Sequence, residues 1–100
     1  MDITVTELKE KLAKKDDFLL IDVREDYEYE EFNLGGKLIP LGDLMHSIDD
    51  LEDKMDEEIV VMCRSGNRSG KAQEILEVHG FSNVRNLEGG VLAWFDKFGQ

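Results

Sequence analysis

The residues best suited to chemistry form one short segment in the second half of the chain. Residues 63–70 have the sequence CRSGNRSG and directly follow the apolar run Ile59–Met62. A loop of small and polar residues before a helix can point successive N–H groups inward and bind an anion. Together with Arg64 and Arg68, these donors would stabilise a thiolate at Cys63 and lower the pKa of that thiol. Since the thiolate is the nucleophilic form of sulfur, the segment predicts an activated cysteine.

The charge distribution favours the same interpretation. The chain carries 23 acidic and 12 basic residues, a formal net charge of -11, yet residues 59–73 contain no Asp or Glu and include Arg64, Arg68 and Lys71. Residues 49–58, immediately upstream, include seven acids. A cationic site in an anionic protein attracts small anions at short range. The alternative is an ordinary buried cysteine beside two solvated arginines. The glycine-containing loop with its flanking arginines favours the activated cysteine over this alternative.

Composition limits the classes of protein to which the chain could belong. A length of 100 residues predicts a single domain over residues 1–100. The negative net charge argues against binding nucleic acid or anionic membranes, and no apolar run approaches the ~20 residues of a membrane span. One cysteine excludes an internal disulfide or Cys-x-x-Cys pair. A free thiol, with no secretory signal pattern at the start, predicts a cytoplasmic protein, although a processed secreted form stays open as an alternative.

Short apolar runs alternate with amphipathic stretches along the chain. The apolar runs predict strands at residues 18–23, 59–62 and 84–87, and shorter extended pieces at 3–5 and 38–41. Helices are predicted after Thr4, over residues 25–32, from Asp43 onward, from the cysteine loop to about His79, and over residues 91–95. This alternation predicts an α/β fold with a small, mainly parallel sheet flanked by helices on both faces. Ligands of such sheets bind beyond the carboxyl ends of the strands, where Cys63 lies.

Four segments resemble, in order, the signatures of the rhodanese family of sulfurtransferases. They are DVRE at residues 22–25 with Glu28-Tyr29, IPL at 39–41, VVMCRSGNRS at 60–69 and NLEGGVLAW at 86–94. Together they span most of the chain. One difference is that the family's Gly-His-Ile run is absent: residues 32–36 read FNLGG and are shorter before Pro40.

The resemblance implies a single-domain rhodanese with the activity of a thiosulfate sulfurtransferase. Cys63 would take the sulfane sulfur of a small anionic donor such as thiosulfate, hold it as a persulfide and pass it to cyanide or a thiol. The loop that would bind the persulfide and the donor comprises Arg64, Ser65, Gly66, Asn67, Arg68 and Ser69. No cofactor or metal is implied. Because the chain has no second cysteine, the acceptor must be external, either a small thiol or a redox or sulfur-relay protein.

Other residues are assigned supporting or structural roles. Asp22 and Arg24 follow a predicted buried strand, and we expect them to pair and to support the loops rather than to act on substrate. Residues 25–31 include five acids, most simply a solvated face, alternatively a docking site for a basic partner. His46 and His79 lack the spacing of metal ligands, and His79 at a helix end is expected to bind backbone carbonyls.

The sequence is also compatible with three alternative functions. The first is a non-enzymatic sulfur relay that serves one protein partner, and the second is a docking domain in which Cys63 is incidental. The third is a phosphatase. Related dual-specificity phosphatases need an arginine one position after Arg68, where this chain has Ser69, so a phosphate would lack donors. A compact monomer is the simplest expected state.

Overall fold

A central parallel sheet organises the chain. The computed structural model describes residues 1–99, and within them four strands pair in the order β2-β1-β3-β4. The strands are β1 (Leu19–Asp22), β2 (Lys37–Leu38), β3 (Ile59–Met62) and β4 (Val84–Asn86), and every pairing is parallel. The helices are α1 (Val5–Lys14), α2 (Asp26–Glu31), α3 (Leu44–Ser47), α4 (Asn67–Val78) and α5 (Gly90–Phe98). The predicted α/β class is therefore confirmed.

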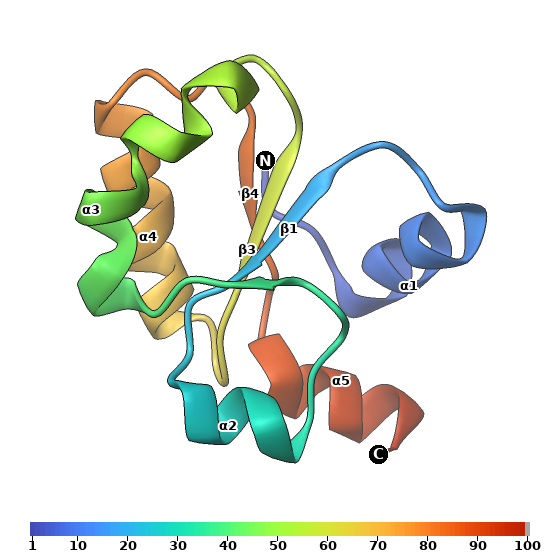
Figure 1. Ribbon diagram of the computed structural model, residues 1–100. Coiled ribbons are helices and arrows are strands. Elements are labelled where there is room, and N and C mark those ends of the chain that lie inside the picture. Colours follow the sequence, from blue (N-terminus) through green and yellow to red (C-terminus); the bar gives the residue numbers. More distant parts are fainter. Residues whose placement is uncertain (100) are drawn as a thin grey trace.

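Helices cover both faces of this sheet. Figure 1 shows α3 and α4 on one side of the strands and α1 and α5 on the other. Side chains alternate between these faces, because successive residues of a strand point to opposite sides. Ile59 and Val61 join the core beneath α3 and α4, whereas Val60 and Met62 pack toward α1 and α5. Burial on both sides explains why β3 is apolar throughout.

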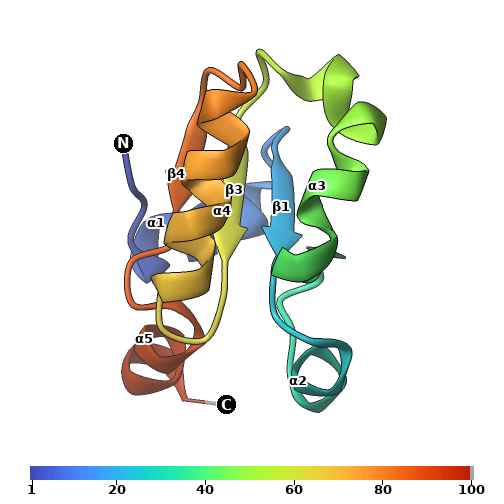
Figure 2. The ribbon, with the colours of Figure 1, turned by 90° about the vertical axis from the view of Figure 1, so that its left-hand side faces the viewer.

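The carboxyl ends of the central strands converge on one edge of the molecule. In Figure 2, β1 and β3 point toward the end of the sheet at which α2 and α5 lie. Asp22 and Met62 are register partners at these ends, so the residues that follow them are brought together. This is the edge at which an open parallel sheet binds ligands.

The N-terminal segment forms less strand than its sequence predicts. Ile3 makes an isolated parallel bridge with Leu87, and Val5 already belongs to α1. The helix predicted after Thr4 begins with a capping box, since the Thr4 side chain accepts from the Glu7 N–H while the Glu7 side chain accepts from the Thr4 N–H. The cap starts the helix at once and leaves one residue for pairing.

The helix predicted from Asp43 breaks into shorter pieces. A 3-10 turn at Leu41–Asp43 leads into α3, and a second 3-10 segment spans Asp49–Lys54. Four of the six residues in that second segment are acidic, and like charges three and four residues apart destabilise an α-helix. The tighter 3-10 turn keeps Ile48 and Leu51 on one buried face, because residues three apart eclipse.

The boundaries of α2 and α4 agree closely with the prediction, whereas α5 extends three residues beyond the predicted 91–95, to Phe98. Helix α4 ends at Val78, and Gly80 follows in the left-handed conformation with a φ of 96°. A ring nitrogen of the exposed His79 lies 2.8 Å from the carbonyl oxygen of Ile75. Over residues 1–99, every helix is too short or too polar to cross a bilayer.

Candidate active site

Cys63 lies directly after β3, at the end of the sheet where α2 and α5 lie. Its side chain has no exposed surface. The Gly66 N–H donates to Sγ at 3.0 Å, and the Ser69 hydroxyl lies 3.3 Å from the same sulfur. The first turn of α5 closes the site from the other side, because the Val91 N–H donates to the Cys63 carbonyl oxygen at 3.0 Å. The loop therefore folds around the sulfur as the sequence predicts.

The surroundings of the thiol stabilise its anionic form. Burial acts to raise the pKa of Cys63, but hydrogen bonds from the Ser69 hydroxyl and from backbone N–H groups outweigh it. The backbone donors belong to Ser69, Gly66 and Ser65, and the net result is a pKa below the ordinary value of a cysteine. The direction of this shift agrees with the prediction made from residues 63–70. The pKa of Cys63 is lowered mainly by hydrogen bonds from the loop rather than by the guanidinium groups of Arg64 and Arg68, which the sequence suggested.

Asn86 joins this network, although no individual role is predicted for it from the sequence. The Ser69 hydroxyl is 2.6 Å from the Asn86 Oδ1, and the Asn86 Nδ2 donates to the Gly66 carbonyl oxygen at 3.1 Å. A hydroxyl carries a single proton, so Ser69 donates either to Asn86 or to the sulfur. When Cys63 is a thiol, the Ser69 hydroxyl can donate to Asn86 and accept a hydrogen bond from the S–H group. When Cys63 is a thiolate, the sulfur has no proton to donate, and the Ser69 hydroxyl must turn its own proton toward the sulfur to stabilise it. Asn86 belongs to the NLEGG segment, which was the available sequence signal.

Removing the Ser69 hydroxyl is expected to weaken the thiolate. In Ser69→Ala, the pH profile of alkylation by iodoacetamide should shift to higher pH, since one of the hydrogen bonds that lower the pKa of Cys63 is gone. At pH 7 the rate should fall by about tenfold or more, as for one lost hydrogen bond to a charged group. Ser82→Ala is the matched control, because its hydroxyl binds Met55 and Asp56 instead. Coincident profiles for Ser69→Ala and the wild type would contradict this role for the hydroxyl.

The two arginines of the loop have different surroundings. Arg68 forms a two-pronged ion pair with Glu28 of α2, with Nη1–Oε1 at 2.6 Å and Nη2–Oε2 at 2.9 Å. The side chain of Arg64 is exposed, and within residues 1–99 it makes no hydrogen bond or ion pair. The solvated face predicted for residues 25–31 is therefore wrong at Glu28, whose side chain is only 14% exposed. Sequence alone could not reveal this contact, because the partners are 40 residues apart.

Ser65 and Asn67 complete the loop. Both are exposed, and Asn67 is the first residue of α4. Between them, Gly66 has a φ of 103°, a left-handed conformation that favours glycine. This turn directs the Gly66 N–H toward the sulfur. It also allows the short connection of four residues between the end of β3 and the start of α4.

Asp22 and Arg24 pair as expected and support the site at the end of β1. Both are buried, and the Asp22 carboxylate accepts from Nε and Nη2 of Arg24 at distances of 2.9 to 3.2 Å. Arg24 also donates to the Phe32 carbonyl oxygen at 2.6 Å. The end of β1 is thereby tied to the end of α2. Arg24 lies close enough to line the pocket described below.

The segment that lacks the family's Gly-His-Ile run has its own supports. The Tyr29 hydroxyl donates to the Gly36 carbonyl oxygen at 2.7 Å, and the Asn33 side chain accepts from the Gly35 N–H at 2.9 Å. Gly36 passes so close to Leu20 that an added Cβ would lie 2.8 Å from its Cγ. These contacts lead the chain from α2 into β2 without the histidine.

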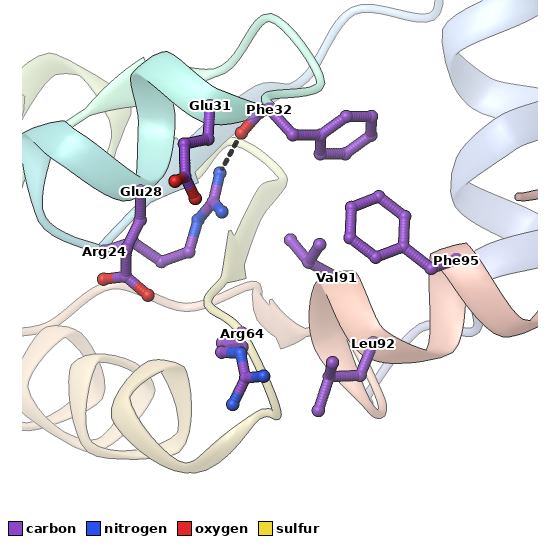
Figure 3. Close-up of a pocket in the computed structure, with 8 residues that line it drawn as sticks. All are labelled: Arg24, Glu28, Glu31, Phe32, Arg64, Val91, Leu92 and Phe95. Carbon is purple, nitrogen blue, oxygen red and sulfur yellow. Dashed lines mark hydrogen bonds between the residues drawn. The ribbon is translucent and has the colours of Figure 1, made fainter. Parts of the chain in front are cut away.

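A pocket of about 430 Å³ opens beside the cysteine loop, between α2 and α5 (Figure 3). Charged side chains line one side of it, namely Arg24, Glu28, Glu31 and Arg64, and apolar side chains the other, namely Phe32, Val91, Leu92 and Phe95. The Phe32 and Phe95 rings meet edge to face, with centroids 4.7 Å apart. A pocket of this size can hold a small organic molecule.

Comparison with known proteins identifies the family. Residues 4–97 match the model of the rhodanese-like domain. The chain belongs to the rhodanese-like family. It is 39% identical to the YtwF protein of Bacillus subtilis, over 93% of this chain and 88% of that protein. A sulfurtransferase of Allochromatium vinosum is 32% identical, over 93% of this chain and 86% of its own length. Among solved structures, the human single-domain sulfurtransferase TSTD1 is similar to this rhodanese-like chain. The two superpose with a TM-score of 0.83 and 25% identity, and the match covers 96% of each chain.

Some relatives are much longer than this rhodanese-like chain. It spans 29% of the length of the tRNA uridine(34) hydroxylase of Acinetobacter baylyi, to which it is 32% identical. The same domain therefore occurs both alone and as part of larger proteins. The resemblance derived from the four sequence segments is confirmed at the level of the family and of the fold.

Proposed function

We propose that this chain is a sulfurtransferase that carries a sulfane sulfur on Cys63. The observation that carries the proposal is the pair of donors at the sulfur, the Gly66 N–H at 3.0 Å and the Ser69 hydroxyl at 3.3 Å. Donors in these positions stabilise both the attacking thiolate and the anionic persulfide that replaces it. Family membership and relatives named as sulfurtransferases support the same activity.

The reaction has two steps that need no external oxidant or reductant. With thiosulfate as donor, the Cys63 thiolate attacks the outer sulfur and forms a new S–S bond. The bond from that sulfur to the sulfonate breaks, and sulfite leaves with the electron pair. An external acceptor, cyanide or a thiolate, then attacks the outer sulfur of the persulfide and releases the Cys63 thiolate. Because Cys63 has no exposed surface, we expect a local opening of the loop before each attack.

Intact-mass measurement tests this proposal directly. Wild type exposed to thiosulfate and desalted should gain one sulfur atom, and cyanide should then remove it with release of thiocyanate. Cys63→Ser should gain none, because the chain has no other cysteine. A wild type that takes up no sulfur from thiosulfate or from a small persulfide would refute the proposal. Uptake with negligible discharge to cyanide would instead favour a relay that delivers sulfur to a protein acceptor.

A further inference from the structure

The charges around the pocket balance one another. Arg24 is neutralised by the buried Asp22, with Nη2–Oδ2 at 2.9 Å. Arg68 is neutralised by Glu28, which binds both of its terminal nitrogens. Of the charged residues that line the pocket, Arg64 and Glu31 remain, and within residues 1–99 neither side chain has a hydrogen-bonding partner. The cationic loop seen in the sequence therefore becomes a site with little net charge.

Glu28 keeps this balance over the whole neutral range. Its hydrogen bonds from Arg68 lower the pKa of the carboxyl from 4.5 to about 2, although burial opposes the shift. While Glu28 holds both terminal nitrogens, Arg68 cannot offer the same two donors to an anionic substrate. Arg64 is then the exposed guanidinium at the pocket, opposite the carboxylates of α2 (Figure 3).

The opposite wall of the pocket is apolar. Phe32 closes it from the end of α2, and Phe95, Val91 and Leu92 close it from α5. Leu92 remains 42% exposed, so apolar surface is open to a ligand there. A compact inorganic anion would leave this wall unused, whereas an organic substituent would bury it.

We propose that Glu28 and Glu31 select the sulfur donor by charge, favouring a singly charged donor with an apolar substituent over a compact dianion. This inference rests on the sulfurtransferase function proposed above. Each carboxylate repels a dianion twice as strongly as a monoanion at the same distance. Removing one of them should therefore improve the use of a dianionic donor more than that of a monoanionic one. Both kinds of donor deliver the same outer sulfur to Cys63.

Two donors with different charge separate this effect from the chemistry of sulfur transfer. Thiosulfate is a dianion and leaves as sulfite, whereas benzenethiosulfonate is a monoanion with a phenyl ring and leaves as benzenesulfinate. With cyanide as common acceptor, kcat/KM is measured for each donor by thiocyanate release. We compare the ratio of kcat/KM for thiosulfate to kcat/KM for benzenethiosulfonate. Both donors share the second step, the transfer of sulfur from Cys63 to cyanide, so any effect of a substitution on that step cancels in the ratio.

The variants are Glu28→Gln and Glu31→Gln, with Glu30→Gln as the matched control. Glu30 is an exposed acid of the same helix that does not line the pocket. We expect the ratio to rise about tenfold in Glu28→Gln and about threefold in Glu31→Gln, mainly through KM for thiosulfate. In Glu30→Gln it should change by less than about twofold, because solvent and salt screen an exposed charge. Glutamine at position 28 keeps the acceptor for the Glu25 N–H and so the start of α2.

The outcomes distinguish this inference from the proposed function. An unchanged or lower ratio in both pocket variants, or an equal rise in Glu30→Gln, would overturn charge selection while leaving sulfur transfer intact. A wild type that accepts sulfur from neither donor would refute the proposed function itself. Thermal unfolding shows whether each variant is folded. If Glu28→Gln is not, the test stands on Glu31→Gln, whose exposed side chain makes no hydrogen bond within the described residues.

Discussion

Asp22→Asn is expected to lower the free energy of unfolding by about 3 to 5 kcal/mol, the usual effect of removing one partner of a buried ion pair. Asp22 has no exposed surface and Arg24 is only 4% exposed. The variant would leave the Arg24 guanidinium buried without its counter-charge. Because Arg24 also holds the Phe32 carbonyl oxygen, the end of α2 and the pocket wall should loosen as well. Urea denaturation followed by circular dichroism measures the change.

Two further variants show whether the unpaired charge is the cause. Asp22→Asn combined with Arg24→Met removes both charges, and should be less destabilised than Asp22→Asn alone. Glu57→Gln removes one partner of the Lys54–Glu57 pair, where both side chains are more than 40% exposed. That change should cost less than about 1 kcal/mol. Equal losses for Asp22→Asn and Glu57→Gln would show that burial of the first pair has no energetic consequence.

Gly90→Ala is expected to destabilise the protein by at least about 3 kcal/mol and to impair sulfur loading of Cys63. Gly90 is the first residue of α5 and has a φ of 56°. An added Cβ would overlap the Cys63 carbonyl oxygen and lie 2.6 Å from that of Arg64. Since Val91 and Leu92 donate to these same two carbonyls at 3.0 Å, the clash would push α5 away from the cysteine loop. Urea denaturation and intact-mass measurement report the two effects separately.

Gly35→Ala is the control that separates backbone strain from steric overlap. Gly35 also has a positive φ, 84°, but an added Cβ would meet no atom within 4 Å. Its substitution should cost about 1 to 2 kcal/mol, the strain of a left-handed residue with a side chain. If Gly90→Ala costs no more than Gly35→Ala, then the close approach of α5 to the loop does not constrain position 90.

Local sequence signals were sufficient for most of the fold. The apolar runs that became β1 and β3 are buried on both faces, and that pattern is characteristic of central strands of a parallel sheet. The Thr4–Glu7 capping box and the left-handed Gly80 mark helix ends through contacts only a few residues long. Such signals can be recognised along the chain because their partners are near in sequence. Apolar spacing alone predicts one continuous helix from Asp43, because it does not reveal the repulsion among neighbouring acids that breaks the helix after α3.

The same distinction between local and long-range contacts applies to the candidate site. The sequence by itself determined the position of Cys63 after a buried strand, in a loop whose small residues can turn their N–H groups toward the sulfur. It also determined the pairing of Asp22 with Arg24, which lie two residues apart. Only the tertiary structure decided that Glu28 neutralises Arg68 and that Asn86 competes with the sulfur for the hydrogen bond from Ser69. Those contacts depend on how α2, α4 and β4 pack at one end of the sheet, and charge pairing across that distance leaves no periodic or local pattern in the sequence.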